Sequence, residues 1–244
     1  MDIYITTFIG FFVGIVGTGL GGFLALLLVS PKNKTLSILL GLTAGLMLSI
    51  ITFDLMPEAL ELSGLKIGIL GIIIGIFVVI FIEDIFNRHS HKKSKSIEGF
   101  LKTGILMGIG IALHNLPEGL AIGSGFMHTS DMGIKVAFVI AIHNMPEGIA
   151  MATPLRMSGF SKLKVLLLTI LAGFPTGIGA LFGAILGSIS EVLIGLCLSV
   201  AAGTMLYITC GELIPNSKII HKGRFSTVGL LIGFILGLWI VEGI

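Results

Sequence analysis

Long apolar segments, separated by short polar ones, are the dominant pattern along this chain. Eight segments come close to the roughly 20 mostly apolar residues that an α-helix needs to cross a bilayer: 3–29, 36–57, 65–86, 101–124, 134–155, 164–188, 191–215 and 225–243. The connections between them are too short for a further folded unit. The pattern therefore predicts an all-α membrane protein with eight transmembrane helices in a single transmembrane domain over residues 1–244.

The composition agrees with this pattern. The chain has 244 residues, of which 55% are hydrophobic and only 11% are charged, and its mean hydropathy is +1.09. Soluble domains carry about 25% charged residues, so the solvent of this chain is the lipid bilayer. A net charge of +2 argues against a nucleic-acid partner. The two cysteines form no CxxC pair, which argues against a structural zinc knuckle.

Basic residues predict the orientation in the membrane. All but two of the 15 lysines and arginines, the exceptions being Lys66 and Lys135, lie in the first, third, fifth and seventh connections or beside them. Basic loops remain on the cytoplasmic side. We therefore expect a multi-pass protein of the cell membrane, inner or plasma, with both termini extracytoplasmic.

A six-residue motif, HNxPEG, occurs twice in consecutive predicted helices of opposite direction. His114 and Glu118 belong to the first copy, and His143 and Glu147 belong to the second. A His and a Glu four residues apart lie on the same face of a helix. The proline between them removes a backbone donor and loosens the turn.

The two motifs together predict a metal site deep in the membrane. Two imidazoles and two carboxylates suit a borderline dication such as Zn²⁺, and the two carboxylates balance its charge. One buried glutamate alone could be a structural residue, but matched pairs in two helices favour a binding role. Asn115 and Asn144 could be ligands of a second ion or could support the first ligands, and the residues leave both interpretations open.

Two further acids indicate a route to and from this site. Asp54 and Glu212 each begin an acid-Leu-x-Pro sequence, one in the second and one in the seventh predicted helix. Because these helices run in opposite directions, Asp54 is expected near the outer face and Glu212 near the inner face. This pairing predicts an inverted repeat of helices 1–3 and 6–8 around helices 4–5. Met47, two turns before Asp54, could contact a soft metal or fill the core, and Glu83 is interpreted as a residue at the end of a span.

These motifs resemble those of the ZIP (Zrt/Irt-like) metal transporters, in particular the bacterial GufA-like branch. The resemblance covers nearly the whole chain and is carried by the two HNxPEG motifs and the two acid-Leu-x-Pro sequences. It implies movement of zinc, and in some members iron, manganese or cadmium, toward the cytoplasm. It also implies the roles of nine residues: central ligands His114, Glu118, His143 and Glu147, second-site residues Asn115 and Asn144, outer residues Met47 and Asp54, and exit acid Glu212.

The chain departs from the family pattern at two positions. Members that bind two metals often have a glutamate before the proline of the sixth helix, where this chain has Phe174 before Pro175. The residue before the exit acid can be a histidine, and here it is Gly211. Each change removes a ligand, so we expect one strong site.

Transport of a divalent metal is the function that these features favour. The chain has no nucleotide-binding loop, and we expect no prosthetic group and no enzymatic activity. A passive metal-selective channel would use the same motifs, and an intramembrane metalloenzyme is a weaker alternative because the HExxH motif is absent. A homodimer is left open.

Overall fold

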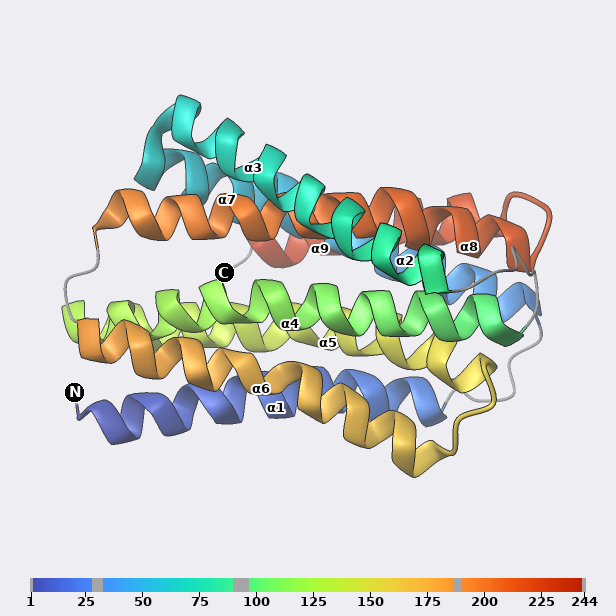
Figure 1. Cartoon of the computed structure of the whole chain (residues 1–244), viewed down its shortest axis with the longest axis horizontal. Coiled ribbons are helices and arrows are strands. Elements are labelled where there is room, and N and C mark those ends of the chain that lie inside the picture. The colour runs from blue at the N-terminus through green and yellow to red at the C-terminus, as the bar shows by residue number, and fades with distance from the viewer. Residues whose placement is uncertain (1, 28–32, 90–96, 187–189, 243–244) are drawn as a thin grey trace.

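A computed structural model shows a nearly all-helical protein, and it describes residues 2–27, 33–89, 97–186 and 190–242 (Figure 1). Its helices follow the apolar segments of the sequence. They are α1 (Ile3–Leu27), α2 (Asn33–Ile50), α3 (Met56–His89), α4 (Ile97–His128), α5 (Ser130–Met157), α6 (Lys162–Leu186), α7 (Glu191–Ile208), α8 (Ile214–Ile220) and α9 (Phe225–Glu242). Two π-helical turns, η1 (Ile51–Leu55) and η2 (Thr209–Leu213), join α2 to α3 and α7 to α8.

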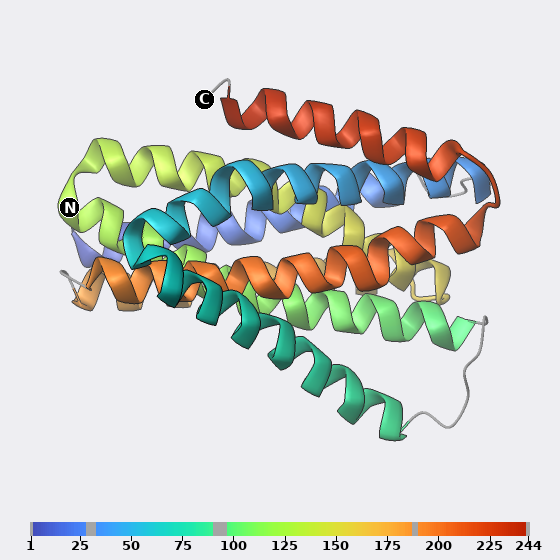
Figure 2. The same ribbon diagram turned by 90° about the horizontal axis from the view of Figure 1, so that it is seen from above.

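Within the described residues, seven helical stretches are long and apolar enough to cross a membrane. The longest, Lys34–Ile85, has 52 residues and contains two of the predicted spans. Gly64 interrupts it with a φ of 75°, a conformation that favours glycine. Figure 2 shows that the chain turns back here, so that α3 runs in the direction opposite to α2. The second and third predicted spans therefore belong to one helical stretch, and the chain reverses direction within it at Gly64.

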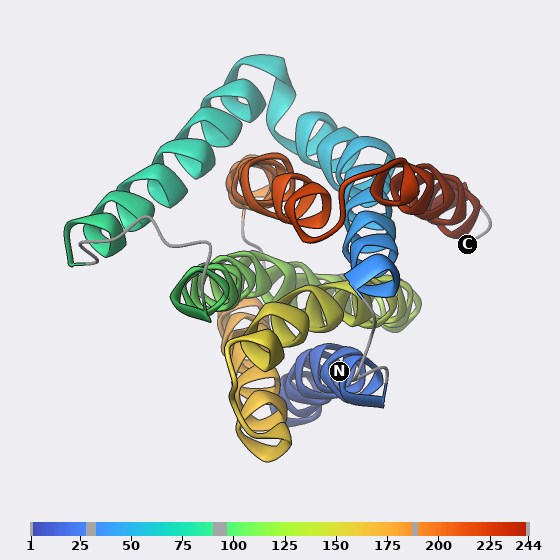
Figure 3. The ribbon, with the colours of Figure 1, turned by 90° about the vertical axis from the view of Figure 1, so that its right-hand side faces the viewer.

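The helices form two bundles, which Figure 3 shows end-on. One contains both HNxPEG motifs: α1 packs on α5 and α6, and α4 packs on the same two helices. We call these four helices the motif bundle. In the other, the companion bundle, α2 packs on α8 and α9, and α3 packs on α7. The main contacts between the bundles are those of α4 with α7 and of α2 with α5.

Glycines bring the helix backbones together inside each bundle. A Cβ atom added at Gly148 would overlap the carbonyl oxygen of Thr18, and one added at Gly45 would overlap that of Leu230. Small residues permit this close approach in lipid, where packing drives helix association. At Gly110, by contrast, the added atom would meet the end of the Ile208 side chain across the boundary between the bundles.

The two π-helical turns are alike in structure and in sequence. In η1 the Met56 amide donates to the Ile51 carbonyl, and in η2 the Ile214 amide donates to the Thr209 carbonyl. Asp54 and Glu212 lie within these turns, and Pro57 and Pro215 follow them. Wide turns of this kind occur frequently at functional sites.

Candidate metal centre

Adjacent helices of the motif bundle carry the central polar side chains. His114 and Glu118 come from α4, and Glu147 comes from α5. The helical backbone continues through Pro117 and Pro146, so neither helix is broken into two. The four-residue spacing of His114 and Glu118 puts both on the same face of α4, toward α5.

These three side chains meet at one point inside the protein. Their ligand atoms all lie within 4.8 Å of one another, and the three residues are buried. His114 Nε2 lies 2.8 Å from Glu147 Oε1, and the exposed fractions of the two side chains are 1% and 0%. Glu118 is 1% exposed. An imidazole and two carboxylates are ligands that a borderline dication accepts, and the two carboxylates balance its charge.

His143 is predicted to complete this set. Its backbone lies in α5, one turn before Glu147, but its side chain is outside the described residues. Its role as a ligand stays a prediction that rests on the repeated motif.

The two motif asparagines are both fully buried. Asn115 Nδ2 donates to the carbonyl of Ala172, at 2.8 Å, and so links α4 to α6. Among the described residues, neither polar atom of Asn144 has a hydrogen-bond partner, and neither has the Asn115 Oδ1. Buried amides are normally paired, so these atoms have capacity left for an ion or for water.

The remaining predicted residues are spread along the molecule. Met47 is 1% exposed and belongs to the large hydrophobic core, where the Thr209 hydroxyl lies 3.9 Å from its sulfur. Asp54 is half-buried and borders a cavity between the bundles. Glu212 accepts hydrogen bonds from Thr103 and Asn216, each at 3.1 Å.

Sequence reasoning missed the polar cluster around Glu212. Glu83 was expected to be only a residue at the end of a span, but Lys102 and Tyr207 both contact it. Tyr207 lies within the apolar seventh segment and Asn216 directly follows it. Their polar side chains were the only feature of the sequence that could have indicated this cluster. The sequence could not show that α3, α4 and α7 bring these side chains together.

The fold and the buried cluster define a class of protein: a nearly all-helical, multi-pass membrane protein with a buried His/Glu group between adjacent helices that could hold a metal ion. The family model of the ZIP zinc transporters matches residues 87–240. The chain is also 31% identical to the zinc transporter ZupT of Salmonella newport (strain SL254) and to that of Salmonella typhimurium (strain LT2). Each alignment covers 96% of this chain and 91% of the relative.

The chain belongs to the ZIP zinc transporter family. It is therefore a multi-pass transporter of the plasma membrane and not an enzyme. The GufA-like branch within the family stays a prediction.

Proposed function

We propose that this chain carries zinc across the membrane into the cytoplasm and binds it on the way at His114, Glu118 and Glu147. The observation that carries the proposal is the meeting of these three buried ligand atoms within 4.8 Å. Burying ionisable side chains inside a membrane protein is costly, and such residues usually mark a functional site. A purely structural role would therefore not explain this cluster. The relatives are named as zinc transporters, which supports zinc over the other dications that such ligands accept.

The proposed topology has eight crossings in one domain over residues 1–244, with both termini outside. The reversal at Gly64 supports counting α2 and α3 as separate crossings. The distribution of basic residues supports the orientation. The matched turns η1 and η2, each with an acid and a following proline, support an inverted repeat of helices 1–3 and 6–8 around helices 4–5.

The proposed route has three stages. Zinc first passes Asp54. It then exchanges its water for the three central ligands and for His143 as a fourth ligand. Finally it leaves past Glu212. Asn115 and Asn144 line the site, and Met47 lies on the outer approach. Iron, manganese and cadmium are further candidate substrates, because His/Glu ligand sets bind several ions of the Irving–Williams series. The proposal leaves a homodimer open.

Zinc flux into proteoliposomes tests the proposal. Wild type is compared with Glu118→Ala and His143→Ala, and Glu242→Ala, at an exposed position near the end of α9, is the matched control. We expect both site variants to lose most of the flux and the control to keep it. Unchanged flux in both site variants would refute the site. A rate that saturates with zinc concentration indicates a carrier, whereas a linear rate indicates a channel.

A further inference from the structure

Two adjacent residues of α4 reach from the motif bundle to the companion bundle. Lys102 Nζ lies 3.3 Å from Glu83 Oε1 on α3. The Thr103 hydroxyl lies 3.1 Å from Glu212 Oε2 in η2. Because these two residues are neighbours in the first turns of α4, both contacts lie at the same end of the molecule. The positive-inside pattern makes this the cytoplasmic end.

The companion bundle supplies further donors to the same two carboxylates. The Tyr207 hydroxyl donates to Glu83 Oε2 at 2.7 Å. Asn216 Nδ2 donates to Glu212 Oε2 at 3.1 Å and lies 3.3 Å from the Thr103 hydroxyl oxygen. Each carboxylate is therefore held by one donor from each bundle.

The Thr103 hydroxyl has a choice of acceptors. It also lies 3.1 Å from the Gly99 carbonyl oxygen within its own helix. A hydroxyl donates only one proton, and an ionised carboxylate is a stronger acceptor than a neutral carbonyl. The hydroxyl can therefore turn between Glu212 and its own helix, which makes the contact between the bundles easy to release.

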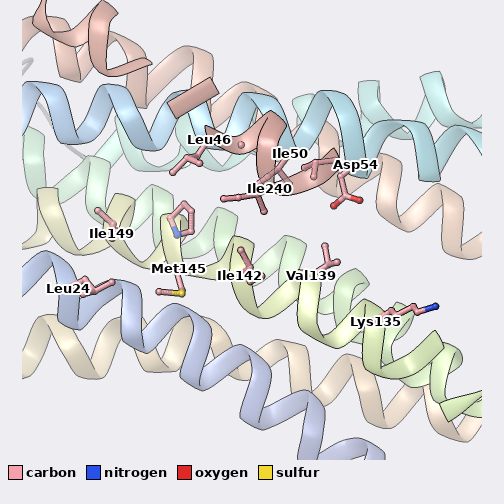
Figure 4. Close-up of a pocket in the computed structure, with 13 residues that line it drawn as sticks. Leu24, Leu46, Ile50, Asp54, Lys135, Val139, Ile142, Met145, Ile149 and Ile240 are labelled. Carbon is pink, nitrogen blue, oxygen red and sulfur yellow. The ribbon is translucent and has the colours of Figure 1, made fainter. Parts of the chain in front are cut away.

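Toward the other end of the molecule, a cavity of about 460 Å³ lies between the bundles (Figure 4). Val139, Ile142 and Ile149 of α5 line one side. Leu46 and Ile50 of α2 and Ile240 of α9 line the other. The bundles are thus bonded by polar side chains at the end where α4 begins, and are separated by a cavity beside the second half of α9.

We infer that Lys102 and Thr103 are positioning residues of the transport cycle, and that they fasten the motif bundle to the companion bundle at the cytoplasmic end. This inference rests on the proposed direction of transport. Glu212 is the proposed exit acid, so a dication that reaches it competes with Thr103 and Asn216 for the same carboxylate oxygen. The arriving metal itself then loosens the contact, and the contact forms again after release.

The strength of these contacts suits a closure that opens in every cycle. The Lys102 and Glu83 side chains are 27% and 24% exposed, and ion pairs that water reaches contribute little net stability. The contacts of Lys102 and Thr103 across the boundary therefore favour the closed end without locking it.

Disulfide formation across the bundles tests the inference without any measurement of transport. Thr103→Cys and Asn216→Cys are introduced together, after Cys197→Ser and Cys210→Ser, and the rate of oxidation is measured in detergent. Adding Lys102→Met should lower the rate of disulfide formation severalfold, because it removes the ion pair with Glu83, the other contact between the bundles at this end. Lys164→Met is the matched control, since the exposed Lys164 of the motif bundle has its Nζ 3.9 Å from the centroid of the nearby Phe160 ring. Equal rates in the two backgrounds would overturn the inference.

A charge exchange then tests the role in the cycle. In proteoliposomes, Lys102→Glu should raise the KM for external zinc severalfold with a smaller effect on kcat, because fewer molecules rest with the cytoplasmic end closed. The double variant Lys102→Glu with Glu83→Lys restores the ion pair and should return the KM toward wild type. A double variant as impaired as the single one would refute the role in transport. Absence of zinc flux in wild type would instead refute the proposed function, and the disulfide rates would still decide whether the contact exists.

Discussion

The contact between His114 and Glu147 shows how two neighbouring helices bring their polar side chains to one point. The 2.8 Å separation places an imidazole nitrogen against a carboxylate oxygen from the neighbouring helix. Both groups must be free of protons to bind a metal, so protons and a dication compete for the same position.

Removal of one negative charge should weaken zinc binding strongly. Glu147→Gln keeps the size of the side chain but makes it neutral and replaces one ligand oxygen by an amide nitrogen. Mutation of residues that only hold the ligands in place already costs about 10- to 100-fold in metal affinity. For loss of a ligand we therefore expect the dissociation constant for zinc to rise at least about tenfold. Titration calorimetry in detergent measures it, with Glu242→Gln as the control. Equal affinity in the two variants would remove Glu147 from the site.

Acid should weaken zinc binding for the same reason. Free imidazole has an ordinary pKa of about 6.5, and the metal-bound form must be deprotonated. Protons therefore favour the empty site, and the apparent affinity should fall by about tenfold or more as the pH is lowered from about 7.5 to about 5.5. Zinc titrations at several pH values measure this. An affinity that is constant over this range would show that no titrating ligand holds the metal.

At the scale of elements, the helices pack according to where glycines lie. Glycine is usually worse than alanine inside a helix, by up to about 1 kcal/mol. Where a neighbouring carbonyl oxygen occupies the space of a Cβ, this order is reversed. Gly123 and Gly125, two residues apart in α4, provide the comparison, because an atom added at Gly123 would overlap the carbonyl oxygen of Ala180 on α6.

Alanine substitutions at these two positions should have different effects on stability. At Gly125 the nearest atom to an added Cβ is 3.4 Å away, which is ordinary contact. Overpacking costs about 1–3 kcal/mol, so Gly123→Ala should lower the melting temperature in detergent by several degrees. Gly125→Ala should leave it unchanged or raise it. If the two variants melt alike, close packing of α4 on α6 is not what stabilises the motif bundle.

The elements also show what the sequence could and could not predict. The eight apolar segments predicted the helices, and the spacing of HNxPEG predicted that His114 and Glu118 share a face, because both depend on local periodicity. The contact of Lys102 with Glu83 was not predicted, since it depends on how α3 and α4 pack. The π-helical turns were missed as well, because a proline three residues after an acid is equally compatible with an ordinary helix end.

At the scale of the whole molecule, two tightly packed bundles meet along a boundary of side chains. The large hydrophobic core includes Met47 and Met205 of the companion bundle and Met107 and Met151 of the motif bundle. Methionine side chains are flexible and adapt to a changing neighbour. A boundary of this kind permits one bundle to shift against the other while each keeps its internal packing, as alternating access requires.

The position of a bound zinc ion tests the central claim most directly. Anomalous X-ray scattering at the zinc edge, from crystals grown with zinc, locates the ion without reference to transport. The account predicts one strong peak about 2.0–2.2 Å from His114 Nε2 and from oxygens of Glu118 and Glu147. A strong peak elsewhere with this cluster empty, or these three side chains directed to separate surfaces, would contradict it.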